Sequence, residues 1–248
     1  GVSNVALPGE IPPSIKFAFA IGAVVFLSAI LYTIFTTSEY PPKDLAAFKL
    51  KKNKTFGEGL KDFISQFLSM PLTMKKLGLI QFFSWFAFFT MWSMANPAIT
   101  EHVFNAPYPE ISTYNLDIVQ EAELFNQANA KFQSASNSTG SYMGIYGLSS
   151  MLFALVLTFY TAKRKISRKY VHMFSLALGG VGFLLMYGMS NPAYLGLSFT
   201  LIGFAWGSVL SMPYAMLSGA VDEENMGVTM GLFNMFIVLP QIIAATGG

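Results

Sequence analysis

Four side chains in one long apolar stretch have types and a spacing that suit a sugar ligand. They follow one another at steps of 4, 7 and 4 residues and are Gln81, Trp85, Trp92 and Asn96. A helix carries all four on one face. Amides pair with sugar hydroxyls, and flat indole rings stack on the apolar face of a pyranose. The structural alternative is that tryptophan favours membrane interfaces and that amides hydrogen-bond a neighbouring helix.

The stretch that carries these residues is long enough to cross a bilayer. Leu77 to Thr100 contains 24 residues without a charge, and roughly 20 apolar residues span the hydrocarbon core as a helix. We expect a spanning helix at 77–98 that is closed by Asn96-Pro97. Glu101 and His102 then fall just beyond the span, as wetted loop residues. The face with the four polar and indole side chains would line a solute path.

The composition indicates a protein that is solvated by lipid. Hydrophobic residues make up 53% of the chain and charged residues only 11%, with a mean hydropathy of +0.50, whereas soluble domains carry about a quarter charged residues. There is no cysteine, and the two histidines, His102 and His172, lie far apart. We therefore expect no disulfide, no metal site and no cofactor. Membrane spans also exclude a nucleic-acid partner.

Five further apolar runs predict five further spans, which gives an all-α membrane protein with six transmembrane helices. The runs lie at 17–37, 141–162, 170–189, 193–219 and 226–246. The 52 residues from Tyr170 to Val221 contain no Asp, Glu, Lys or Arg and are divided by a tight turn at Asn191-Pro192. An acidic turn at 222–225 then separates the last two spans.

Three segments organise the chain. Residues 1–37 form an outer loop and the first span, 38–76 a lysine-rich loop, and 77–248 a bundle of five helices with an outer loop at 99–140. Within the lysine-rich loop, apolar side chains from Phe56 to Leu68 follow helical spacing and predict an amphipathic helix. Within the outer loop, Leu116 to Phe132 has the composition of a short extramembrane helix. Asn137-Ser138-Thr139 matches an N-glycosylation sequon.

The distribution of basic residues predicts the orientation of the spans. The segments 38–76 and 163–169 hold 13 of the 15 Lys and Arg residues. The positive-inside rule places both segments in the cytoplasm. The helix at 77–98 then runs from inside to outside.

Other spans carry further candidates for a binding face. They are Tyr146 in 141–162, Trp206 and Tyr214 in 193–219, and Asn234 and Gln241 in 226–246. The two amides lie seven residues apart and so on one face of a helix that Pro240 interrupts. Buried amides in lipid are costly unless they are satisfied, and interhelical bonds and solute binding both satisfy them. Gly179, Gly180 and Gly182, by contrast, predict close helix packing.

No Asp, Glu, Lys or Arg lies at the centre of a predicted span. Ionisable residues at depth mark ion or proton paths. The sequence therefore shows no proton relay of its own.

Three segments resemble the major facilitator superfamily. TAKRKISRKY resembles the basic loop that recurs between the second and third helices of each half of these transporters, although its usual Gly and Asp are missing. QFFSWFAFFTMWSMANPAITEHVFNA and MGVTMGLFNMFIVLPQIIAATGG resemble the seventh and eleventh helices of the sugar–cation symporters. These include the sucrose and maltose carriers and, more distantly, the melibiose-type (glycoside–pentoside–hexuronide) group.

The resemblance implies a fold of twelve helices in two bundles, with the solute site between the bundles at mid-membrane. This chain would supply helices six to eleven, and a first bundle of the same protein would be its partner. Both ends of the sequence look cut, so we expect a piece of a longer protein. The resemblance also implies coupling to protons through acidic residues of the first bundle. The expected location is the cytoplasmic (inner) membrane of a bacterium.

The leading hypothesis is a secondary active transporter that moves a disaccharide or related glycoside across the lipid bilayer. Its partners would be the sugar and a coupled cation, for which we expect H+. A membrane enzyme is disfavoured because the sequence shows no paired carboxylates at depth, no histidine cluster and no nucleophile beside a base. Two alternatives stay open: a non-transporting sensor or scaffold on a transporter fold, and a facilitator for another small solute.

Overall fold

The computed structural model describes residues 11–38, 56–188, 191–219, 221 and 226–247. Within these ranges all regular structure is helical, and six helices are long and apolar enough to cross a membrane. The predicted all-α membrane fold is thereby confirmed. The lysine-rich segment 39–55 and the acidic turn 222–225 lie outside the described residues. The chain divides into two compact units, residues 1–62 and 63–248, which are treated separately below.

The first unit contains the helix α1, Pro13–Thr36. Pro13 occupies the first helical turn, where its missing N–H costs nothing. None of the described side chains of α1 is buried within its own unit. The helix α3, Phe56–Leu68, crosses the boundary between the two units and confirms the helix predicted there.

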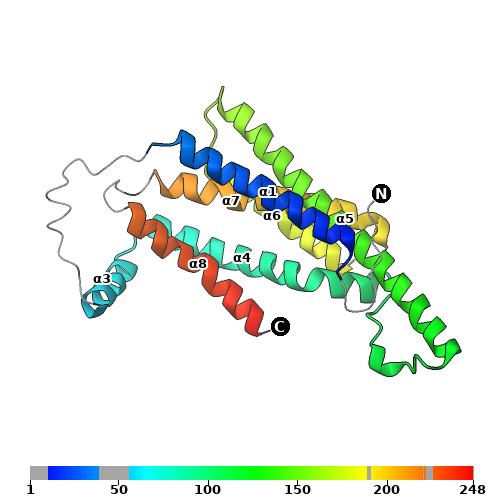
Figure 1. Ribbon diagram of the computed structural model, residues 1–248. Coiled ribbons are helices and arrows are strands. Elements are labelled where there is room, and N and C mark those ends of the chain that lie inside the picture. The colour runs from blue at the N-terminus through cyan, green and yellow to red at the C-terminus, as the bar shows by residue number, and fades with distance from the viewer. Residues whose placement is uncertain (1–10, 39–55, 189–190, 220, 222–225, 248) are drawn as a thin grey trace. The chain divides into compact units, whose positions relative to one another are not determined.

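The second unit consists of five long helices and three short helical turns (Figure 1). In chain order they are α4 (Leu72–Ala98), the π-helical η1 (Ile99–Val103), the 3-10 helix η2 (Ile111–Thr113), α5 (Val119–Thr161), α6 (Arg168–Gly188), the 3-10 helix η3 (Pro192–Tyr194), α7 (Leu195–Leu217) and α8 (Met226–Thr246). The four later spans thus match their predicted positions at their C-terminal ends to within about two residues, the usual uncertainty of helix boundaries.

The helix α7 is the most buried element of this unit, and glycines bring it close to α5. A Cβ at Gly203 would collide with the Ser149 side chain, and one at Gly207 would lie 3.0 Å from the carbonyl oxygen of Ser150. Small residues allow such close approach between membrane helices, where packing replaces the hydrophobic effect. Ser149 and Ser150 lie on the same buried face of α5 as Tyr146, as their spacing predicts.

Glycines of α6 bring that helix equally close to the other side of α7. A Cβ at Gly179 would collide with Ala205, and one at Gly182 would lie 2.8 Å from the carbonyl oxygen of Ser198. The Ser198 hydroxyl donates a hydrogen bond to the Gly182 carbonyl. Close packing is confirmed for these two glycines and is wrong for Gly180, where a Cβ would meet no atom of the described residues within 4 Å.

The helix α4 begins five residues before the span predicted at 77–98 and ends at Ala98, as predicted. It begins directly after Pro71, and Pro97 lies inside it rather than closing it. Proline removes the N–H that would bond the Ser93 carbonyl, but the chain continues as a π turn. The Thr100 hydroxyl lies 2.9 Å from the Asn96 carbonyl oxygen and 3.2 Å from that of Pro97, and so helps to satisfy this end of the helix. Glu101 and His102 lie exposed in the π turn.

The short helix predicted at Leu116 to Phe132 is present but does not end there, because α5 runs without a break from Val119 to Thr161 over 43 residues. The break predicted between this helix and the span at 141–162 is wrong. The short extramembrane helix and the sequon are parts of this one helix. No proline interrupts it, and the cost of about 1 kcal/mol for Gly140 in a helix interior is small. Buried contacts of Phe125 and Ala135 favour the helical state.

The remaining loop folds back on the first half of α5. Tyr108 and Phe132 meet edge to face at 5.3 Å between ring centroids, and Tyr114 and Phe125 at 5.5 Å. The Lys131 ammonium donates to the Asn105 carbonyl at 2.8 Å. These contacts explain why a polar segment stays helical.

The glycine contacts of α6 give a test of the packing. Gly179→Val should destabilise the protein by about 1–3 kcal/mol, because the added carbons overpack the contact with Ala205. Gly180→Val is the matched control, because the neighbouring position has open space. Thermal unfolding of both variants, followed by fluorescence-detected gel filtration, measures the difference. Equal losses of stability would contradict the close contact between α6 and α7.

Candidate functional site

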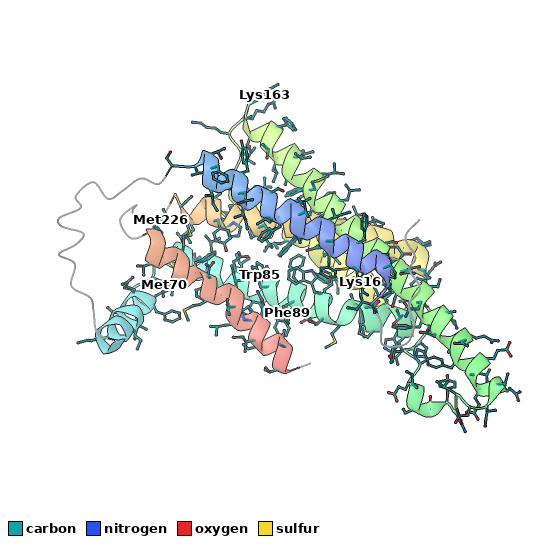
Figure 2. All side chains as sticks on the ribbon, in the orientation of Figure 1. Lys16, Met70, Trp85, Phe89, Lys163 and Met226 are labelled. Atoms are coloured by element: carbon teal, nitrogen blue, oxygen red, sulfur yellow. The ribbon has the colours of Figure 1, made fainter. Side chains whose placement is uncertain are left out.

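The structure brings all three tryptophans of the chain together. Trp85 and Trp92 come from α4 and Trp206 from α7, and Figure 2 labels Trp85 on its helix. The ring centroids lie 6.1 Å apart for Trp85–Trp92, 5.1 Å for Trp85–Trp206 and 4.9 Å for Trp92–Trp206. The planes are nearly perpendicular, with angles from 77° to 90°. Edge-to-face geometry is the favoured arrangement because the edge of one ring is positive and the face of the other negative.

Three further rings complete what we call the aromatic cluster: Phe88 of α4, Tyr146 of α5 and Phe183 of α6. The Phe88 ring is 2% exposed and lies 4.9 Å from Trp206 and 6.4 Å from Tyr146, between centroids. It also lies 5.8 Å from Phe183. Sequence reasoning missed Phe88, although it follows Trp85 by three residues and precedes Trp92 by four. Phe183 has no comparable helical spacing from another candidate residue in the sequence.

Polar atoms of the aromatic cluster are buried without a hydrogen-bond partner among the described residues. They are Tyr146 Oη and Trp85 Nε1, and the neighbouring Gln81 Oε1 is in the same state. An unsatisfied buried polar group costs about 1–3 kcal/mol. The phenol can donate and accept, the indole can donate, and the amide oxygen can accept. Their role toward a ligand stays a prediction.

Gln81 occupies an interhelical position. Its side chain is fully buried, and Nε2 donates to the Val209 carbonyl of α7 at 3.4 Å. One turn later on α4 and one turn earlier on α7, Trp85 meets Trp206, so the two helices run antiparallel at this contact. The amide thus holds the two helices together, and its role toward a solute stays a prediction.

Tyr214 and Asn234 form a second polar group. The Tyr214 hydroxyl donates to Asn234 Oδ1 at 3.1 Å and joins α7 to α8. The Tyr214 ring also meets Phe233 edge to face at 5.6 Å. Since Tyr214 follows Trp206 by eight residues, it lies about 12 Å further along α7, toward the end that carries the basic residues 163–169.

Asn96 and Gln241 take part in neither group. Asn96 is exposed near the end of α4, and Gln241 is half-buried, seven residues beyond Asn234 on α8. Of the nine predicted binding residues, the structure therefore gathers four in the aromatic cluster, places Gln81 beside it and pairs two near the basic end.

A comparison with protein-family models finds the Major Facilitator Superfamily over residues 11–245. The chain belongs to the major facilitator superfamily. Its helices are thus part of a multi-pass membrane transporter, and proteins of this superfamily are typically transporters rather than enzymes. A comparison with curated proteins finds no match.

Substitution of two tyrosines on one face of α5 tests whether the Tyr146 hydroxyl of this transporter lacks a hydrogen-bond partner. Tyr146→Phe should leave the free energy of unfolding unchanged or raise it by at most about 3 kcal/mol, because it removes a buried hydroxyl without a partner. Tyr142→Phe is the matched control and should cost about 0.5–1.5 kcal/mol, because the Tyr142 hydroxyl donates to the Pro192 carbonyl at 3.0 Å.

Thermal unfolding of the two variants in one detergent measures the comparison. A larger loss for Tyr146→Phe than for Tyr142→Phe would show that the Tyr146 hydroxyl has a partner within the folded protein.

Proposed function

We propose that this superfamily member is a secondary active transporter that moves a disaccharide or related glycoside together with a cation, by alternating access. The observation that supports the proposal most directly is the aromatic cluster with its unsatisfied polar atoms. Protein cores normally satisfy buried donors and acceptors. A site that keeps three of them unpaired beside edge-to-face rings is suited to a ligand that brings both hydroxyls and a flat apolar face.

The position of the cluster along its helices agrees with a solute site at mid-membrane. Trp85 lies 13 residues from either end of α4, and Trp206 lies 11 residues from either end of α7. Substrate sites of secondary transporters lie near the bilayer midplane. A belt of interfacial tryptophans would instead lie at the helix ends. The central position therefore favours solute binding over membrane anchoring.

A sugar fits the chemistry of these side chains. The C–H groups of a pyranose present a weakly positive face, which lies favourably on the negative face of an indole ring. The phenol of Tyr146 and the indole N–H of Trp85 supply hydrogen bonds of both senses. The Tyr214–Asn234 pair would extend the site along α7 toward the basic end. The substrate class of sucrose and maltose follows from the resemblance of α4 and α8 to the sugar–cation symporters.

The proposed mechanism uses a second bundle of the same protein. The helices described here would form the sixth to eleventh of twelve, and rocking of two bundles around the midplane site would expose it to each side in turn. The described spans carry no Asp, Glu, Lys or Arg near their centres. A carboxylate of the other bundle would therefore bind the coupling ion, for which we propose H+. The proposed location is the inner membrane of a bacterium.

Uptake by the intact transporter in proteoliposomes tests this function. Labelled sucrose or maltose should accumulate when a pH gradient is imposed. Trp85→Ala and Asn234→Ala should each weaken apparent affinity at least about tenfold, which is ~1.4 kcal/mol. Asn126→Ala is the control, because Asn126 is exposed on the first half of α5 and should leave uptake unchanged.

The alternatives give different results in the same experiment. Equilibration of the sugar without a response to the gradient would favour a facilitator. Absence of flux for every tested glycoside, from protein that is folded, would overturn the transport of sugars and favour another solute or a sensor. Unchanged affinity in both Trp85→Ala and Asn234→Ala would overturn the assignment of the site.

A further inference from the structure

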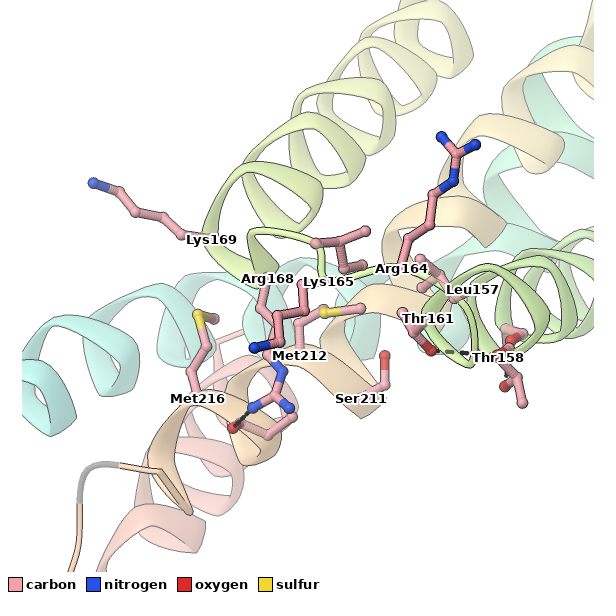
Figure 3. Close-up of a pocket in the computed structure, with 13 residues that line it drawn as sticks. Leu157, Thr158, Thr161, Arg164, Lys165, Arg168, Lys169, Ser211, Met212 and Met216 are labelled. Carbon is pink, nitrogen blue, oxygen red and sulfur yellow. Dashed lines mark hydrogen bonds between the residues drawn. The ribbon is translucent and has the colours of Figure 1, made fainter.

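A hollow opens at the basic end of the bundle, and Figure 3 shows the side chains that line it. Its volume is about 830 Å³. The last turns of α5, the connection 162–167, the first turn of α6 and the last turns of α7 surround it. None of the residues predicted to bind the solute lines it. The hollow is therefore a separate candidate site from the one proposed for the solute.

Four basic residues line this hollow, Arg164, Lys165, Arg168 and Lys169, and its lining contains no acidic residue. Its hydroxyl groups are already in use as donors: Thr158 donates to the Ala154 carbonyl and Ser211 to the Gly207 carbonyl. The free donors are thus those of the lysines and arginines. Several cationic donors around one space suit an anion with several oxygens, and guanidinium groups match the geometry of phosphate.

A hydrogen bond to α7 fixes the position of the Arg168 side chain at this hollow. Its guanidinium donates to the Ala215 carbonyl of α7 and so bridges the mouth between α6 and α7. One bond of this kind leaves about four of the five N–H donors of the group. Figure 3 shows Arg164 and Lys169 extending away from one another at the rim, on either side of Arg168. An anion bound at Arg168 therefore lies between two long, flexible cationic side chains that can turn toward it.

The other half of the hollow is apolar and continues onto an exposed face of α5. Leu157, Met212 and Met216 line its wall. Arg164 also belongs to a neighbouring hollow of about 490 Å³, which Val156 and Phe159 line. Phe159 is 72% exposed and Val156 65%. Because both residues lie on the part of α5 that spans the membrane, these apolar surfaces face acyl chains of the bilayer.

The charge distribution puts this site beside the leaflet that supplies such a ligand. The connection between α5 and α6 is one of the two basic segments that the positive-inside rule places in the cytoplasm. The cytoplasmic leaflet is rich in anionic lipids, and basic pockets between membrane helices on this side bind their headgroups. We propose that this hollow binds an anionic phospholipid, with the phosphate among Arg164, Lys165 and Arg168 and an acyl chain along Val156 and Phe159 of α5.

Native mass spectrometry of the intact transporter tests the site. Phosphatidylglycerol should remain bound where phosphatidylcholine is lost, since only the former carries net negative charge. Lys165→Gln with Arg168→Gln should weaken phosphatidylglycerol binding at least about tenfold. Lys131→Gln removes one charge at the opposite end of α5 and should leave binding unchanged. Arg164→Gln with Lys165→Gln supplies the test if loss of the Arg168–Ala215 bond prevents folding.

Two results would overturn the proposal. The first is phosphatidylglycerol binding that is equal in wild type and in the folded double variant. The second is competition by inorganic phosphate or glycerol phosphate at concentrations comparable to the lipid, which would assign the hollow to a soluble phosphate compound. Phe159→Ser separates the sources further, because it should weaken binding of the lipid and leave binding of inorganic phosphate unchanged.

Discussion

The close approach of the α7 backbone to α5 and α6 is the constraint on which the second unit depends. Helices in lipid gain no hydrophobic free energy by meeting one another, so packing and interhelical hydrogen bonds hold them together. Gly203 and Gly182 permit that contact on opposite sides of α7, and Ser198 adds a bond to a backbone carbonyl. With α7 packed between its neighbours, Trp206 lies among the rings of α4 and α5.

Much of the fold could be predicted because the bilayer fixes the length of an uncharged run. All six predicted spans correspond to helices. The start of α5 at Val119 and the continuation of the chain past Pro97 as a π turn could not be predicted from local composition. Pro97 and the polar residues 119–140 both disfavour helix as isolated segments, yet the Thr100 hydroxyl and the buried Phe125 support it in the folded chain. Tertiary contacts of this kind override weak local preferences.

The candidate site likewise has a part that could be predicted from the sequence and a part that could not. The stripe on α4 follows from helical periodicity, so Trp85 and Trp92 could be placed on one face in advance. Their meeting with Trp206 depends on how two distant helices pack, which no spacing within one helix contains. The burial of Gln81 against the Val209 carbonyl is unpredictable for the same reason. The basic residues 163–169 predict orientation, but the hollow that they line exists only because α7 ends beside them.

The length of α5 has a mechanical consequence. Its 43 residues measure about 65 Å, while the hydrocarbon core is only about 30 Å thick. About half of the helix therefore lies beyond the hydrocarbon core as a rod continuous with a membrane span. A tilt of the span by about 10° would carry the tip of a rod of ~30 Å through about 5 Å. A small tilt of the span thus produces a larger displacement at Val119. An antibody fragment bound at Val119 would oppose that displacement.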